Sequence, residues 1–188
     1  MPRGMTNSLT NKKVAFLVAP EGVEQVELTE PWQAVENAGG TAELVSTEIG
    51  TVQAYHHLTP GDVFTTEVSA DQVSAADYDA LVLPGGVANP DLLRTDAAAV
   101  ALVRSFFDTG TPVAVICHGP WTLIEADAVR DRAITSWPSL HTDLRNAGAH
   151  WADEEVVVCT GGPNTLLSSR KPDDLPAFCA KLVEIVAN

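Results

Sequence analysis

Cys117 lies in a stretch whose residue types suit nucleophilic chemistry. The apolar run Val113 to Ile116 before it is typical of a buried strand, and His118-Gly119-Pro120 after it is typical of the start of a helix. A sharp turn between the two would project the thiol above the sheet, as a nucleophile elbow does. The dipole of the following helix is expected to favour the thiolate and to lower the pKa of Cys117. A buried, inert cysteine is the alternative.

Two more loops are expected at the same edge of the sheet as Cys117. In an open parallel sheet, ligands bind beyond the carboxyl ends of the strands. This rule selects the acidic loop 20–27, which follows the first apolar run, and Pro84-Gly85-Gly86, which follows another. We expect the N–H groups of Gly86 and His118 to form an oxyanion hole, because the glycines let the second strand end approach closely.

Apolar runs alternate with segments of helix length along the chain. Five runs predict strands, at 14–19, 42–46, 80–83, 113–116 and 156–158. The runs are continuous rather than alternating in polarity, as strands covered on both faces require. Segment 52–68 is less regular and is expected to be a small hairpin or excursion. The sequence therefore predicts a doubly wound, mainly parallel α/β sheet with helices on both faces.

Two helices have clear signals in the sequence. Thr95 or Asp96 is expected to cap the first, in which Val100, Val103 and Phe107 recur at helical spacing, and Gly110 is expected to end it. The second helix, at the end of the chain, has an apolar stripe at 178, 182 and 185 that indicates core packing.

Length and charge limit the classes of protein to consider. A chain of 188 residues fits one domain, which we place at 13–188 after a polar, flexible tail at 1–12. The formal charge of −14 disfavours nucleic acid as a partner, because phosphates are bound by clustered Lys and Arg. We find no secretion signal and no apolar run long enough to cross a membrane, so we expect a soluble, cytoplasmic protein.

Five segments carry a resemblance to a known family. They are EQVEL at 24–28, DALVLPGG at 79–86, ICHGP at 116–120, NAGA at 146–149 and SSRKPDDL at 168–175. Together they resemble the ThiJ/PfpI superfamily, and within it the PfpI branch of intracellular proteases and general stress proteins. The resemblance covers about residues 13–188. It implies a flavodoxin-like fold related to class I glutamine amidotransferases.

The resemblance also implies roles for individual residues. Cys117 would be the nucleophile, Glu24 a protonated acid that donates a hydrogen bond to it, and His118 the base. Without the resemblance, Glu24 would be read as a solvated loop acid. In PfpI-like proteins a Glu of the neighbouring subunit orients the histidine. The matching loop here has Asp91 and is one residue longer, which puts peptidase activity in doubt.

Other kinds of site are not favoured by the sequence. The remaining histidines, at 56, 57, 141 and 150, lie in different segments without carboxylates at ligand spacing, so we expect no metal. A glutamine amidotransferase would need a His-x-Glu after Cys117, and FMN would need a phosphate loop after the first strand. We expect no cofactor. Three cysteines without CxxC spacing are expected to be reduced thiols, and Cys159 precedes a turn, 160–164, that is longer than the family pattern.

Three functions are compatible with this reading. The first is a stress-related hydrolase or lyase, that is, a protease, glyoxalase or deglycase, in which the Cys117 thiolate attacks an electrophilic carbonyl of a small compound or a peptide. The second is a non-catalytic stress protein whose Cys117 becomes oxidised. The third is a homo-oligomeric chaperone. In each case we expect a second copy of the chain as a partner, in a dimer or a larger oligomer.

Overall fold

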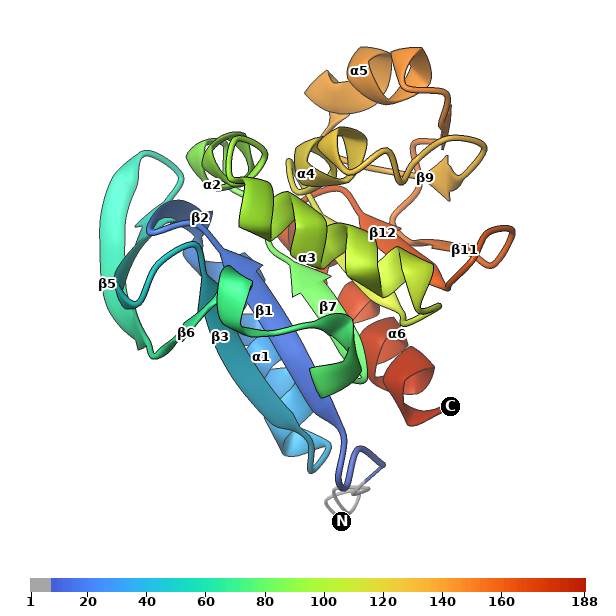
Figure 1. Ribbon diagram of the computed structural model, residues 1–188. Helices are drawn as coiled ribbons and strands as arrows, with labels where there is room; N and C mark the ends of the chain where they lie inside the picture. Colours follow the sequence, from blue (N-terminus) through green and yellow to red (C-terminus); the bar gives the residue numbers. More distant parts are fainter. Residues whose placement is uncertain (1–7) are drawn as a thin grey trace.

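A seven-stranded sheet forms the centre of the computed structural model, which describes residues 8–188 (Figure 1). In spatial order its strands are β11 (Val157–Cys159), β12 (Leu166–Ser169), β8 (Val113–Ile116), β7 (Ala80–Leu83), β1 (Lys13–Val18), β3 (Thr41–Ser46) and β6 (Val68–Ser69). All neighbours are parallel except the edge strand β11, which pairs antiparallel with β12. The predicted doubly wound α/β sheet is confirmed.

Helices cover both faces of this sheet (Figure 1). Helices α1 (Gln25–Asn37) and α6 (Leu175–Ala187) pack on one face, and α3 (Ala97–Asp108) and α4 (Pro120–Glu125) pack on the other. Side chains alternate between the faces along each strand, so Phe16 of β1 belongs to the first core and Leu17 to the second. Each fully buried side chain of this size contributes roughly 2 to 3 kcal/mol.

Smaller elements surround the main sheet. A three-stranded sheet is formed by β2 (Glu21–Glu24), β4 (Gly50–His56) and β5 (Thr59–Thr66), and a two-stranded one by β9 (Ala133–Ile134) and β10 (His150–Trp151). The remaining α-helices are α2 (Ala88–Leu93) and α5 (His141–Asn146), and short 3-10 turns lie at Ala70–Gln72, Ala75–Asp77, Pro138–Leu140 and Pro172–Asp174. The expected small hairpin at 52–68 is β4 and β5.

Both predicted helices are present, and the first has the expected ends. The Asp96 side chain accepts a hydrogen bond from Ala99 N–H at 2.8 Å, which caps α3. Gly110 follows α3 with φ of 74°, a left-handed conformation that glycine adopts without strain.

Part of the expected flexible tail at 1–12 contacts the core. Residues 1–7 of the expected flexible tail lie outside the described part of the chain. Within the remainder of that tail, Leu9 is fully buried beside Val35 and Ala38, and its N–H donates to Ala38 O at 2.9 Å. Leu9, an apolar side chain in a polar segment, therefore packs against the core ahead of residue 13.

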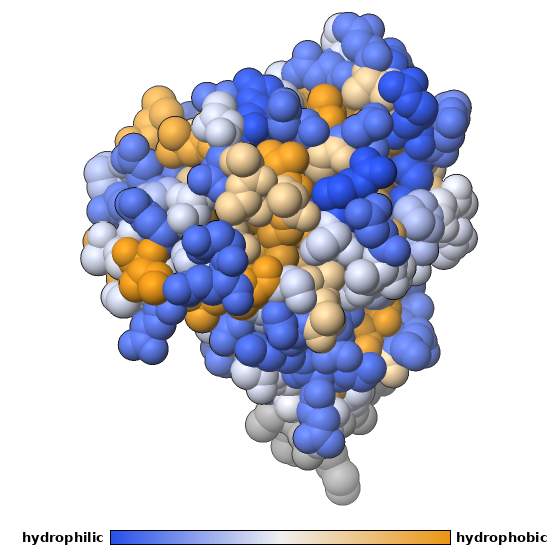
Figure 2. All heavy atoms as spheres, viewed as in Figure 1, coloured by the Kyte–Doolittle hydropathy of each residue, from blue (hydrophilic) through white to orange (hydrophobic). Residues whose placement is uncertain are grey.

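Hydrophilic residues cover most of the face shown in Figure 2, and a pale apolar area lies over the alanine-rich start of α3. Among residues 8–188, no helix is both long and apolar enough to cross a membrane.

Candidate active site around Cys117

Cys117 forms the sharp turn between β8 and α4. Its φ is 62°, in the left-handed region that non-glycine residues rarely adopt, at a cost of about 1 to 3 kcal/mol. Two backbone hydrogen bonds hold this conformation: Cys117 N–H donates to Ser169 O at 3.1 Å, and Trp137 N–H donates to Cys117 O at 2.9 Å. A side chain at Gly119 would lie 2.7 Å from Val115 Cγ2. The structure thus contains the strand-to-helix elbow that the sequence predicts.

Backbone N–H groups surround the sulfur. Those of Gly86 and His118, the two predicted oxyanion donors, both hydrogen-bond the Cys117 thiol. Gly85 has no room for a side chain, because a Cβ there would lie 2.6 Å from Cys117 Cβ. Gly86 adopts a φ of 82° against the backbone of Gly22. The close approach of these glycines places two donors where negative charge on sulfur can be stabilised.

The carboxyl beside the thiol is that of Glu27. Its Oε2 accepts a hydrogen bond from Gly85 N–H at 2.8 Å, the side chain is fully buried, and the carboxyl interacts directly with the Cys117 thiol. Its other oxygen, Oε1, has no conventional hydrogen-bond partner among residues 8–188. A protonated Glu27 would therefore have an O–H free to donate to sulfur.

The prediction that Glu24 hydrogen-bonds the thiol is wrong. Glu24 ends strand β2, and its Oε2 accepts the N–H of His57 at 3.0 Å. The helix begins at the next residue, so Glu27 lies in its first turn. Glu27, Pro31 and Val35 are spaced by four and share the buried face of α1. This helical spacing is the sequence signal that would have identified Glu27 as the buried acid.

Burial sets the protonation of the pair. Burial raises the pKa of Glu27 to about 8, against the hydrogen bonds from Gly85 and Cys117, so that this carboxyl is mostly neutral at pH 7. Burial also raises the pKa of the Cys117 thiol, as does the charge that Glu27 carries once ionised. The pKa of Cys117 is therefore raised rather than lowered as expected, because burial and Glu27 outweigh the backbone hydrogen bonds from Gly86 and His118.

His118 contacts the thiol in spite of its adjacent position in the sequence. Its Nδ1 lies 3.2 Å from Cys117 Sγ, and its ring packs between Trp121 and Trp137, with centroids 5.3 and 5.7 Å away. Burial lowers the pKa of His118 to about 4. The imidazole is therefore neutral at pH 7, and its Nδ1 can accept the thiol proton.

Asp91 lies on the exposed side of α2 and does not reach His118 within the single chain. Its Oδ1 accepts hydrogen bonds from Arg94 at 2.6 and 3.1 Å. The Arg94 guanidinium lies 4.8 Å from the ring centroid of Trp121, which in turn contacts His118. Within residues 8–188, the only hydrogen bond of the His118 ring is to Cys117.

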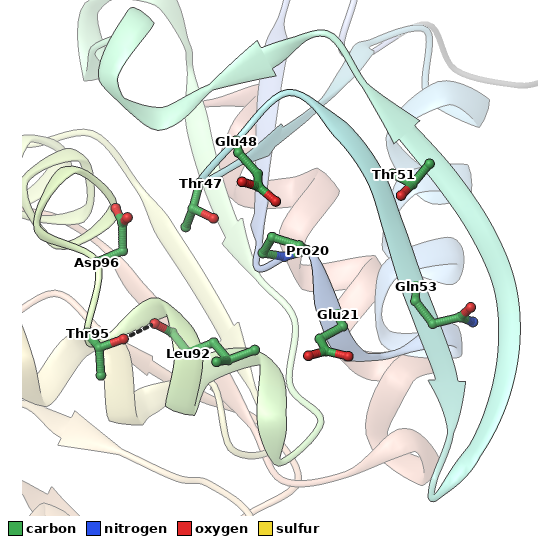
Figure 3. A pocket seen from close by; sticks show the side chains of 9 residues that line it. All are labelled: Pro20, Glu21, Thr47, Glu48, Thr51, Gln53, Leu92, Thr95 and Asp96. Atoms are coloured by element: carbon green, nitrogen blue, oxygen red, sulfur yellow. Dashed lines mark hydrogen bonds between the residues drawn. The ribbon is translucent and has the colours of Figure 1, made fainter.

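Two cavities on the surface do not include the thiol. One cavity of about 580 Å³ has Glu21 and Gln53 on one side and Leu92, Thr95 and Asp96 on the other (Figure 3). A second, of about 520 Å³, lies between α3 and the end of α4. Cys117 is 6% exposed and lines neither of them. Among residues 8–188, no three His, Cys, Asp or Glu side chains are grouped as a metal site requires.

Comparison with known proteins identifies the family. The model of the DJ-1/PfpI family matches residues 12–185. The chain belongs to this family. "Deglycase PH1704" of Pyrococcus horikoshii is 40% identical to it over 93% of this chain and 99% of its own length. "Putative cysteine protease YraA" of Bacillus subtilis is 39% identical over 89% and 94%, and "General stress protein 18" of the same species is 40% identical over 89% and 93%.

Solved structures show the same fold for the DJ-1/PfpI chain. A ThiJ/PfpI domain protein from Brachyspira murdochii superposes with a TM-score of 0.83 at 23% identity, covering 97% of this chain and 98% of its own. The flavodoxin-like fold implied by the sequence resemblance is confirmed. The relatives' names connect the family with deglycation, proteolysis and stress.

Proposed function

We propose that the protein is a deglycase of the DJ-1/PfpI family that uses Cys117 to attack adducts of small α-oxoaldehydes such as methylglyoxal. The observation that supports this proposal is the position of the Cys117 sulfur on a strained elbow. The sulfur is surrounded by two backbone N–H groups, the neutral Glu27 carboxyl and the neutral His118 imidazole. These groups favour a thiolate that forms when a substrate is present. The low exposure of Cys117 favours a small electrophile over a folded peptide.

The proposed reaction balances without an outside oxidant. In the hemithioacetal adduct the C–S bond to the model thiol breaks and the hydroxyl proton passes to that thiol, which regenerates the aldehyde. The Cys117 thiol proton then passes to His118 Nδ1, the Cys117 sulfur bonds to the aldehyde carbon, and the carbonyl electrons move to oxygen, where the N–H groups of Gly86 and His118 stabilise the charge. The hydrogen on that carbon then moves as a proton to the neighbouring ketone carbon, which leaves a thioester. Water releases lactate and restores the thiol. The aldehyde carbon is oxidised and the ketone carbon reduced, so the electrons balance within the substrate.

The proposal is tested by incubating the protein with methylglyoxal and with its adduct to a model thiol. We expect lactate to form from both substrates. From the adduct, we also expect the free model thiol to be recovered in an amount equal to the lactate. Cleavage of a denatured protein substrate without release of lactate would instead favour a peptidase, the activity that the name of the YraA relative indicates.

We further propose a cytoplasmic location, where thiols stay reduced. Fractionation of expressing cells would test it.

We also propose that a second copy of the chain completes the site by placing its Asp91 near His118. Asp91 is exposed, and the apolar side chains of Val87 and Leu92 beside it are exposed too, as an interface would require. If this acid orients the imidazole, Asp91→Asn is expected to lower turnover about a hundredfold while the oligomer persists. Asp108→Asn, which removes a comparable exposed partner of Arg104, is the matched control. A fully active Asp91→Asn oligomer would remove Asp91 from the site.

A further inference from the structure

Arg132 carries a buried charge that is not paired with a carboxylate in the part of the chain that the structure describes. Its side chain lies between β9 and the turn after β11, and the residue is 3% exposed. Its guanidinium donates to Asn164 Oδ1 at 2.9 Å, Asn164 O at 2.7 Å and Cys159 O at 3.2 Å. Among residues 8–188, no carboxylate lies within 4.0 Å of it. Arginine stays protonated in proteins, and a buried cation is costly without an anion beside it.

Of the groups within residues 8–188 that hydrogen-bond Arg132, the Cys159 thiol is the one that can become an anion. Arg132 Nε–H donates to Cys159 Sγ at 3.3 Å, and the N–H groups of Gly161 and Ala133 also hydrogen-bond the sulfur. Burial raises the pKa of Cys159, but these three donors and the guanidinium charge outweigh it, so that the pKa is lowered. Cys159 therefore has the thiolate-stabilising surroundings that the sequence had predicted for Cys117.

We propose that Cys159 and Arg132 form a second thiolate site, separate from Cys117, at which a hydroperoxide oxidises Cys159. The sulfur donates an electron pair to one peroxide oxygen, the S–O bond forms, and the O–O bond breaks. With hydrogen peroxide the leaving hydroxide takes up the proton of the sulfenic acid and departs as water, and with an organic hydroperoxide the leaving alkoxide takes it up and departs as an alcohol. Sulfur is oxidised by two electrons and the peroxide is reduced by two. The product sulfenate keeps a negative charge beside the Arg132 guanidinium.

The turn that follows Cys159 gives small oxidants access. Cys159 is 7% exposed, and the next four residues, 160–163, are exposed. Space around Gly161 is open, with no atom within 4 Å of where a side chain would begin. Gly162, in contrast, packs against the guanidinium, since a Cβ there would lie 2.6 Å from Arg132 Cζ. The lengthened turn thus covers the cation and leaves a path to the sulfur.

The two thiols act independently because they lie at opposite ends of the strands: Cys117 at the carboxyl end of β8 and Cys159 level with its amino end. Cys159 pairs with Leu166, and Leu166 pairs with Val113 at the start of β8, whereas Cys117 follows the last residue of that strand. Four strand residues span about 13 Å, which is too far for a disulfide between Cys117 and Cys159. Oxidised Cys117 therefore cannot be resolved by Cys159 within one folded chain.

The test compares Cys159 with Cys179 in the folded Cys117→Ser protein. The pKa of Cys179 is raised to about 12 by burial and by the charge of Glu30, so this thiol serves as an internal reference. After brief treatment with hydrogen peroxide at neutral pH, sulfenic acid is trapped with dimedone and mapped by peptide mass spectrometry. We expect Cys159 to be trapped at least about tenfold faster than Cys179. Equal rates, or trapping of Cys159 only after unfolding, would overturn the proposal.

A substitution at Asn164 tests the part played by the guanidinium charge. Asn164→Asp keeps the acceptor oxygen facing Arg132 and adds a carboxylate that competes with the thiolate for the cation. We expect oxidation of Cys159 to slow about tenfold, while Arg132 and its packing stay in place. An unchanged rate in a folded Asn164→Asp protein would show that the guanidinium does not activate the thiol. The comparison of Cys159 with Cys179 is made in a protein that keeps Asn164, so its result holds whether or not Asn164→Asp folds.

Discussion

Replacing Cys117 by alanine is expected to lower lactate formation from methylglyoxal by at least about a thousandfold. No other described thiol lies at the elbow, so the covalent step is lost rather than weakened. The alanine retains Cβ, which keeps the packing against Gly85, and the fold should therefore persist. The measurement is initial-rate lactate production by the wild-type and Cys117→Ala proteins at equal concentration, with circular dichroism to verify folding.

Cys159→Ser provides the matched control for this experiment, because Cys159 is also buried but lies at the other end of the sheet. Its turnover is expected to equal that of the wild type. Activity of Cys117→Ala within tenfold of the wild type would reject Cys117 as the nucleophile. It would leave the proposed oxidation of Cys159 untouched, since that oxidation is measured without turnover.

The raised pKa of Glu27 should lower the stability of the folded protein by about 2 kcal/mol between about pH 6.5 and pH 8, and Glu27→Gln should remove this contribution. The pKa of Glu27 is raised from 4.5 to about 8, so its proton favours the folded state fully below about pH 4.5. This contribution is lost as the pH rises through 8. His118 acts in the opposite sense below its ordinary pKa of 6.5, because its folded pKa is lowered to about 4. The effects of Glu27 and His118 oppose each other between about pH 4.5 and 6.5, and the lowered pKa of Cys159 opposes Glu27 at higher pH, so the difference between the wild type and Glu27→Gln isolates the Glu27 contribution.

Urea unfolding at a series of pH values measures this slope. Glu21→Gln is the control, because Glu21 is an exposed acid of the same loop and is not among the groups that shift the pKa of Glu27, whereas the charge of Glu24 raises that pKa. We expect its stability to follow the wild-type pH dependence. Equal slopes for Glu27→Gln and the wild type would mean that Glu27 is already ionised in the folded protein, and it could then not donate to Cys117.

The sequence alone was sufficient for the elements whose signal is local. Continuous apolar runs identified β1, β3, β7 and β8, and hence the edge where Cys117 lies. Strand β12 was missed because half of its four residues are serines, whose hydroxyls find partners only in the folded chain. Its place beside β8 depends on pairing between segments about fifty residues apart, which no local pattern encodes.

The errors at the site have a common cause. The choice of Glu24 over Glu27 and the direction of the Cys117 pKa both depend on how deeply a side chain is buried. Burial of a carboxyl or a thiol follows from the helices and loops that pack over it, and these come from separate parts of the chain. Residue type and spacing therefore identified the Cys117 sulfur as the reacting atom, but they did not predict its protonation state.

The hydrogen bond from Cys117 N–H to Ser169 O makes the geometry of the elbow depend on a residue that is synthesised later than Cys117. A ribosome adds Ser169 about fifty residues after Cys117, which takes several seconds at about 5 to 20 residues per second. During that interval β8 lacks its neighbour β12, and the turn at Cys117 lacks the carbonyl that holds it. The emerging chain therefore presents an ordinary thiol with a pKa of about 8.5. A chain that ends before β12 would contain Glu27, Gly86, Cys117 and His118, yet it would lack one of the two backbone hydrogen bonds that hold the elbow.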